Sequence, residues 1–311
     1  MILRKQDWPR YGAAMTLLVV AASCVPPAGS RDIAASPQTS MPAPAPAPAP
    51  VRQPTLVLGE FILRGNPQQG DVLRGVVPGQ TRALTLDGAP ISVTGDGDFL
   101  IAFDRDAAAR ARLVATVTDG RQVVRDLEVA PGTWRIEYIN APYRGGASSD
   151  ADFERRRPAE LAQIAAARNT LVDSGGWKQR FRWPVTGRLS GFFGSQRVYQ
   201  GKPGTYHGGT DIAVPAGTPF VAPADGVVVL AAAAPFTLEG NLLIVDHGMG
   251  LNSAFLHCQR LDVKVGDRVV QGQVLGTVGR TGRATGPHMH WGLKWRDARL
   301  DPAKLADPIG G

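Results

Sequence analysis

Short apolar runs separated by turn-forming residues dominate the first half of the chain. Between residues 55 and 138 these runs are only a few residues long, and stretches such as Gly65-Asn66-Pro67 and Gly95-Asp96-Gly97-Asp98 divide them. Many short strands at regular spacing are typical of a β-sandwich. We therefore predict an N-terminal immunoglobulin-like β-sandwich over residues 55–141, a region that contains neither His nor Cys.

The period of the apolar positions changes near residue 150. Leu161, Ile164 and Leu171 recur at the spacing of an amphipathic helix. We predict one helix within residues 150–173, as the main element of a linker over residues 142–178 that joins the sandwich to the rest of the chain.

The histidines are concentrated near the C-terminus, where all five lie between residues 207 and 290. His207 is followed by Asp211 at the end of a His-Gly-Gly-Thr-Asp motif, His288 and His290 form a His-Met-His motif, and His257 lies between the two motifs. A catalytic zinc site needs three such ligands and one open position. On a strand, residues two apart point to the same face, so His288 and His290 are expected side by side. The glycine pair in the first motif argues against a helix there.

The segments around these motifs are similar to those of the LytM/lysostaphin-type zinc endopeptidases, which cut peptidoglycan cross-bridges. The resemblance covers roughly residues 180–302. It is carried by His207–Ala213, Pro215–Pro219, Ala222–Gly226, Asp246–Gly248, Val265–Asp267 and Thr281–His290. It implies a C-terminal, all-β antiparallel LytM-type peptidase domain over residues 179–311, and a mainly β protein as a whole.

The resemblance also implies a role for each site residue. His207, Asp211 and His290 would bind one Zn²⁺ per chain, and His257 and His288 would be the catalytic imidazoles. Zinc lowers the pKa of a bound water toward neutrality, and an imidazole can take the water proton and deliver it to the leaving amine. We expect His288 to be the base and His257 to stabilise the oxyanion, although the two roles could be exchanged.

Two residues near the site are predicted to be structural. His247 lies in an Asp-His-Gly sequence that suits a hairpin turn. Cys258 follows His257, and neighbouring residues on a strand face opposite ways, so this cysteine is expected to be a small buried apolar residue.

The N-terminus has the features of an export signal over residues 1–24. A basic start precedes an apolar core, Tyr11–Ala22, which is shorter than the roughly 20 residues that span a membrane. The sequence before Cys24 fits a lipoprotein signal in which Cys24 is lipidated, and simple cleavage after Ser23 is the alternative. Residues 25–54 contain alternating Pro and Ala, which favours an extended spacer.

The net charge and the export signal then limit the classes of binding partner that we expect. The net charge of +7 indicates attraction to polyanions. Export removes access to nucleic acid, so the expected partners are peptidoglycan stem peptides and, through Cys24, the membrane. Together with the resemblance, these features predict a periplasmic, membrane-anchored lipoprotein of a Gram-negative envelope. The resemblance implies that it hydrolyses peptidoglycan cross-links by metal-activated water, and the lipoprotein signal suggests a D-alanyl–diaminopimelate bond as the target. The alternatives are a catalytically silent amidase regulator and a wall-binding protein.

Overall fold

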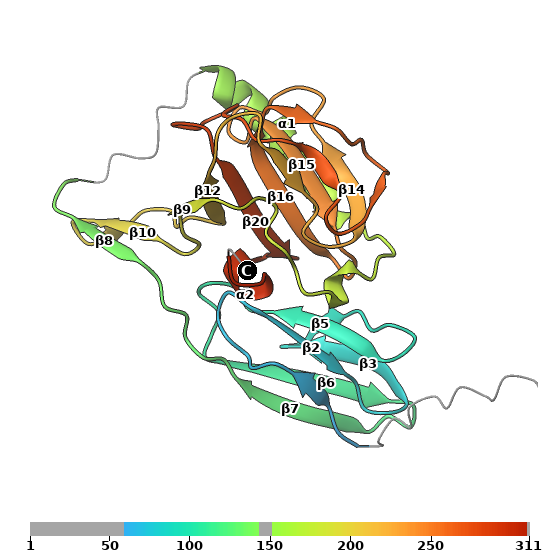
Figure 1. Cartoon of the computed structure of the whole chain (residues 1–311). Helices are drawn as coiled ribbons and strands as arrows, with labels where there is room; N and C mark the ends of the chain where they lie inside the picture. Colours follow the sequence, from blue (N-terminus) through green and yellow to red (C-terminus); the bar gives the residue numbers. More distant parts are fainter. Residues whose placement is uncertain (1–58, 143–150, 310–311) are drawn as a thin grey trace, which may run out of the picture. The chain divides into compact units, whose positions relative to one another are not determined.

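The computed structural model describes residues 59–142 and 151–309, which form a mainly β structure (Figure 1). The signal predicted for residues 1–24 and the spacer predicted for residues 25–54 lie outside the described residues. Within the described ranges, neither of the two α-helices is long and apolar enough to cross a membrane.

Seven strands of the N-terminal region form two antiparallel sheets. They are β1 (Ile62–Arg64), β2 (Val72–Val76), β3 (Thr81–Leu86), β4 (Ala89–Ile91), β5 (Asp98–Ala102), β6 (Arg110–Val117) and β7 (Gln122–Glu128). One sheet has the order β1-β2-β5 and the other the order β4-β3-β6-β7. Three strands in one sheet and four in the other agree with an immunoglobulin-like sandwich. The predicted fold class of this region is confirmed.

Alternation along β6 shows how the sequence produces the sandwich. Leu113 and Ala115 are fully buried, and the residues between buried positions are exposed or partly exposed. The other sheet contributes Leu73, Phe99 and Ile101, which are also fully buried in the same core. Because strand side chains alternate between faces, one face of each sheet supplies this core.

The described residues after β7 form three sheets, together with a long helix and two short helical segments. The elements are β8 (Ile136–Ile139), α1 (Ala151–Asn169), η1 (Gly176–Lys178), β9 (Arg188–Gly191), β10 (Gln196–Tyr199), β11 (Lys202–Pro203), β12 (Thr210–Ala213), β13 (Pro219–Val221), β14 (Gly226–Ala231), β15 (Asn241–Asp246), β16 (Leu251–Cys258), β17 (Arg260–Leu261), β18 (Arg268–Val269), β19 (Val274–Thr277), β20 (Met289–Trp295), β21 (Ala298–Leu300) and α2 (Pro302–Leu305). The main antiparallel sheet has the order β18-β14-β15-β16-β20-β12-β9, with β21 beside β20, and the two smaller sheets have the orders β13-β19-β17 and β11-β10-β8. The predicted all-β antiparallel peptidase fold is therefore confirmed.

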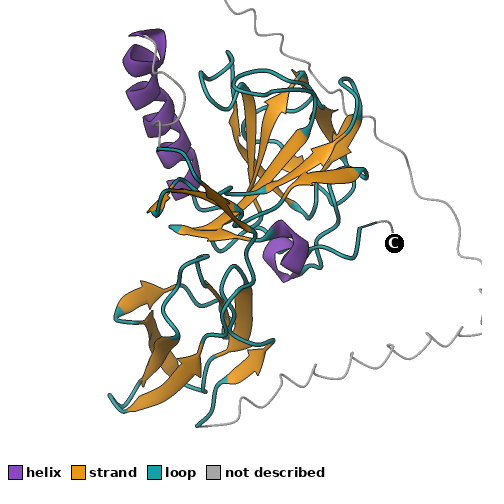
Figure 2. Ribbon diagram, turned by 90° about the vertical axis from the view of Figure 1, so that its left-hand side faces the viewer, coloured by secondary structure: helices purple, strands orange, loops and turns teal. Residues whose placement is uncertain are grey.

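The predicted helix is observed as α1, which ends at Asn169 and lies against one face of the main sheet (Figure 2). Ile164 of α1 belongs to a buried cluster with Leu242 and Ile244 of β15. The alternate β15 residue Leu243 faces the larger core. Because both faces of β15 are covered, its sequence is a continuous apolar run rather than an alternating one.

The sandwich and the C-terminal region share one apolar core and several hydrogen bonds. Arg74 Nε donates to the carbonyl of Trp177 at 2.7 Å, and Lys304 Nζ donates to the carbonyl of Gln69 at 2.8 Å. β8 pairs in parallel with β10 of the C-terminal region. β8, which follows the last strand of the two sandwich sheets, therefore contributes to the surroundings of the site described next.

Candidate metal centre

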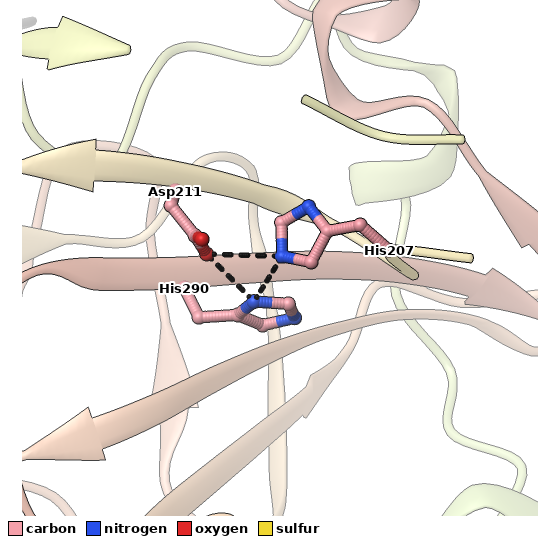
Figure 3. Close-up of side chains that lie close together, drawn as sticks. All are labelled: His207, Asp211 and His290. Carbon is pink, nitrogen blue, oxygen red and sulfur yellow. Dashed lines mark hydrogen bonds and ion pairs between the residues drawn. The ribbon is translucent and has the colours of Figure 1, made fainter. Parts of the chain in front are cut away.

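Two neighbouring strands and the segment before one of them bring three ligand side chains together (Figure 3). β12 carries Asp211 and β20 carries His290, and these two residues are directly opposite in the antiparallel register. Directly opposite residues point to the same face of a sheet. His207 comes from the segment that enters β12, so its ring reaches the same place.

The three ligand atoms form a small triangle. His207 Nε2 lies 3.1 Å from His290 Nδ1, and Asp211 Oδ1 lies 3.2 Å from His207 Nε2 and 2.8 Å from His290 Nδ1. Tetrahedral zinc with bonds of about 2.0–2.1 Å places its ligand atoms about 3.3 Å apart. The donor set of two imidazoles and one carboxylate therefore fits a zinc ion with small adjustments.

The backbone orients His207 for this role. The N–H at Nδ1 of His207 donates to the carbonyl of Phe192 at 3.1 Å, which leaves the lone pair at Nε2 directed to the triangle. Fixing the tautomer of a metal-binding imidazole in this way is a general feature of metal sites. Gly191 provides the space, because an added Cβ there would lie 2.3 Å from Asp211 Oδ2.

The electrostatics favour the metal-binding forms of two ligands. Burial alone would raise the pKa of Asp211, but hydrogen bonds with His207 and His290 outweigh it and hold that pKa well below its ordinary value. Burial lowers the pKa of His290. An ionised carboxylate and a neutral imidazole are the forms that bind a metal ion.

The other two predicted residues lie beside the triangle. His288 Nε2 is 3.8 Å from Asp211 Oδ1, and the ring centroids of His257 and His288 are 4.9 Å apart. The Nδ1–H of His288 donates to the carbonyl of Gly286 at 2.9 Å, and that of His257 donates to Thr281 at 2.8 Å. Each imidazole thus keeps Nε2 available, and the structure brings all five predicted residues into one site.

His257 reaches the site through an unusual backbone conformation. Its φ is +63°, in the left-handed region that non-glycine residues rarely adopt. Its N–H donates to the carbonyl of Glu239 at 2.8 Å. Such conformations are often found at functional sites, where the surrounding structure holds them. A strand pattern in the sequence gives no signal for this local departure.

The two residues predicted to be structural have contacts of that kind. His247 is fully buried, with Nδ1 donating to the carbonyl of Asp225 at 2.8 Å and Nε2 accepting from the hydroxyl of Ser253 at 2.8 Å. Within the described part of the chain it is outside the metal-ligating group. Cys258 is fully buried and free, and burial raises the pKa of its thiol to about 12.

A buried arginine of the sandwich supports the segment that holds His207. Arg105 is 5% exposed, and its Nε donates to the carbonyl of Gly194 at 3.0 Å. Gly194 N–H in turn donates to the carbonyl of His207 at 2.9 Å. Next to this segment, a cavity of about 740 Å³ is lined by residues 135–137, 190–192, 195–197, 199 and 204–207. Sequence reasoning missed Arg105, because this residue is remote along the chain from every motif.

Known proteins are similar to this chain over the region that contains the site. The family model described as Peptidase family M23 matches residues 205–302, a range that contains all five site residues. Peptidoglycan DD-endopeptidase ShyA of Vibrio cholerae is 37% identical over 131 residues, which are 41% of this chain and 30% of that protein. Cell division protein DipM of Caulobacter vibrioides is 33% identical over 148 residues, 48% of this chain and 23% of that protein. The chain therefore matches less than a third of the length of these curated relatives.

A solved structure matches much more of the molecule. A crystal structure from Pseudomonas aeruginosa, assigned to peptidase M23, has a TM-score of 0.58 and 31% identity to this chain. The match covers 78% of this chain and 95% of the solved one. By this match and by the family model that spans its metal-binding motifs, the chain belongs to peptidase family M23.

Proposed function

We propose that this protein is a zinc-dependent endopeptidase that hydrolyses peptide cross-links of bacterial peptidoglycan. The observation that carries the proposal is the site itself, in which His207, Asp211 and His290 form a ligand triangle beside His257 and His288. One zinc ion per chain would occupy the triangle. Three of the curated relatives are named peptidoglycan DD-endopeptidases, which supports the substrate class.

The site residues divide the chemistry between them. Bound zinc would lower the pKa of a water molecule and polarise the scissile carbonyl. His288, whose Nε2 is close to Asp211, accepts the proton of the attacking water and returns it to the leaving amine. His257, whose ring centroid is 4.9 Å from that of His288, stabilises the developing oxyanion. An exchange of these two roles is the alternative.

The proposed substrate bond is the D-alanyl–diaminopimelate cross-link, and the names of the relatives agree with a bond of the DD type. The proposed location is the periplasm. In this proposal residues 1–24 direct export, Cys24 is lipidated or the signal is cleaved before it, and residues 25–54 separate the membrane from the sandwich of residues 55–141. The linker of residues 142–178 then leads to the peptidase domain of residues 179–311.

Digestion of purified sacculi tests the proposal. Zinc-loaded wild-type protein should convert cross-linked muropeptide dimers to monomers. The summed mass of the two monomers should exceed that of the dimer by one water molecule. His290→Ala should lose both zinc and cleavage, whereas His288→Ala should keep zinc and lose cleavage. Folding of each variant is checked by circular dichroism. A folded His290→Ala protein that cleaves at the wild-type rate would contradict the site, and zinc-bound wild type that leaves dimers intact would favour a regulator of amidases.

A further inference from the structure

Two polar side chains on one side of α1 bind the segment between β14 and β15 at residues 235–240, the β14–β15 turn. Arg156 donates to the carbonyl of Pro235 at 2.6 Å. Glu160 accepts hydrogen bonds from the backbone N–H and the hydroxyl of Thr237 at 2.8 and 2.6 Å. Residues four apart on a helix share one side, so both contacts come from the same side of α1. The helix therefore holds this turn at two points.

A third residue of α1, Arg157, binds the side chain of Glu239 in the same turn. Its two terminal nitrogens donate to the two carboxylate oxygens at 2.6 and 2.8 Å, and the two side chains are only 16% and 11% exposed. Arg157 Nη1 is also 3.5 Å from Oε2 of Glu160. An arginine and a carboxylate paired through two parallel bonds fix each other's position as well as neutralising charge. The Arg157–Glu239 pair therefore ties Glu239 to α1.

The main chain of Glu239 contacts a residue of the candidate site. Its carbonyl accepts the N–H of His257 at 2.8 Å, and reciprocal bonds of 2.8 and 2.9 Å between Phe236 and Gly240 close the turn. His257 has a left-handed backbone, which a non-glycine residue keeps only where the surrounding structure holds it. The bond from Glu239 acts on this backbone directly. Glu239 therefore joins α1, through its carboxylate, to His257, through its carbonyl.

The β14–β15 turn also borders the hydrogen-bond partner of the His257 ring. The Nδ1–H of His257 donates to the carbonyl of Thr281 at 2.8 Å. Gly240 lies against Thr281 with no space for a Cβ, and Thr281 Oγ1 accepts the N–H of Asn241 at 2.9 Å. A shift of the turn would thus displace both the backbone bond and the ring bond of His257.

We infer that Arg157 and Glu239 are positioning residues, which hold the β14–β15 turn so that the His257 imidazole keeps its place beside the metal site. This inference rests on the proposed function, in which His257 stabilises the oxyanion or, in the exchanged assignment, is the base. Both residues act through the backbone of the turn rather than on the substrate. α1 precedes residues 205–302, which match the family model, so the matched segment does not include Arg157.

Matched variants of α1 test this positioning role. Arg157→Gln removes the paired charge, and Arg157→Lys keeps the charge without the planar fork that binds both carboxylate oxygens. The control Arg155→Gln removes the same charge from an exposed arginine of the same helix, which pairs with Asp152. Hydrogen exchange of the His257 amide is followed by NMR in each metal-free protein. The zinc Kd is then measured, together with kcat and KM of each zinc-loaded protein on purified cross-linked muropeptide dimers.

A positioning role predicts a loss of kcat with KM and zinc affinity retained. In Arg157→Gln, kcat should fall at least about tenfold, because a misplacement of about 1 Å in a catalytic site costs about 100-fold in rate. The His257 amide should exchange at least about tenfold faster, because its acceptor carbonyl is no longer held. KM and the zinc Kd should equal those of wild type, since β12 and β20 carry Asp211 and His290. Arg157→Lys should lie between wild type and Arg157→Gln, and Arg155→Gln should match wild type.

Either a wild-type kcat or a wild-type exchange rate of the His257 amide in folded Arg157→Gln would overturn the inference. An equal fall in kcat in Arg155→Gln would overturn it as well. If Arg157→Gln does not fold, Arg157→Lys decides in the same way, and wild-type values in that variant would refute the role. If zinc-loaded wild type cleaves no dimers, the proposed function fails, and exchange in the metal-free proteins then decides whether the Arg157–Glu239 pair holds His257. Faster exchange in Arg157→Gln than in Arg155→Gln would support that contact, and equal exchange would refute it.

Discussion

Adding one methyl group beside the ligands should disrupt the metal site without replacing any ligand. Gly191 of β9 is opposite Asp211, and its φ is outside the left-handed region, so alanine is compatible with the backbone. The Cβ of Gly191→Ala would lie 2.3 Å from Asp211 Oδ2 and 3.0 Å from His207 Cε1. An ordinary contact is near 3.4 Å, so the carboxylate must move by about 1 Å.

The movement of the Asp211 carboxylate determines how much zinc affinity Gly191→Ala should lose. Metal–ligand distances tolerate errors of about 0.2 Å, and disturbing the groups that orient ligands typically costs 10–100-fold in metal affinity. We expect the zinc Kd of Gly191→Ala to rise by at least about tenfold, which is about 1.4 kcal/mol. Competition with a fluorescent zinc chelator measures the Kd directly.

A second glycine supplies the matched control. Gly286 precedes His288 by two residues, and a Cβ there would meet nothing within 4 Å. Gly286→Ala should therefore bind zinc with the wild-type Kd. If Gly191→Ala also bound zinc with the wild-type Kd, Asp211 and His207 would not be the ligands, and the assignment of the site would be wrong.

Three further predictions concern stability. Burial lowers the pKa of His247 to about 4, so the folded protein loses stability as pH falls below 6.5, where the imidazole is protonated more readily in the unfolded chain. Burial raises the pKa of Asp246 to about 6, so the folded protein gains stability as pH falls below about 6, where the buried carboxyl takes up a proton. Asp246→Asn removes the gain from protonation of Asp246. Between pH 7 and pH 4, the free energy of unfolding of this variant, measured by urea titration, should fall by about 3 kcal/mol more than that of wild type. If the free energies of unfolding of the two proteins changed with pH in the same way, the prediction would be wrong. Phe255 is fully buried, so Phe255→Ala should lower the free energy of unfolding by about 3–5 kcal/mol, and a loss below about 1 kcal/mol would contradict its place in the core. Zinc at 100 times its Kd should stabilise the folded protein by about 2.7 kcal/mol, seen in calorimetry as a Tm that falls when a chelator is added, and an unchanged Tm would argue against a native zinc site.

Periodicity and motif spacing predicted much of this structure. Alternation in β6 and the helical spacing around Ile164 gave the correct element types, because burial of one face produces both patterns. Leu161 and Leu171, which the helical pattern also included, are exposed, and Leu171 lies beyond the end of α1. The two histidine motifs predicted neighbours that the sheet register brings together, since β12 places Asp211 opposite His290. The element types follow from local period, whereas the grouping of His207, Asp211 and His290 came from the resemblance to known zinc endopeptidases.

Features that depend on contacts between distant segments were not predictable. The parallel pairing of β8 with β10 joins strands separated by more than fifty residues, and no turn signal specifies it. The left-handed conformation of His257 follows from the bond between its N–H and Glu239, not from the residue type. Ile164 joins a buried cluster with Leu242 and Ile244 only because α1 packs on the main sheet. Tertiary packing determines each of these positions.

Zinc titration with a substrate readout tests whether one bound zinc ion per chain makes this protein a peptidoglycan endopeptidase. Zinc is added stepwise to metal-free protein, and the loss of cross-linked muropeptide dimers is followed by mass at each step. We expect no cleavage without metal, a linear rise in rate as zinc is added, and a break in that rise at one zinc per chain. Full cleavage by metal-free protein, or intact dimers after one zinc has bound, would contradict it.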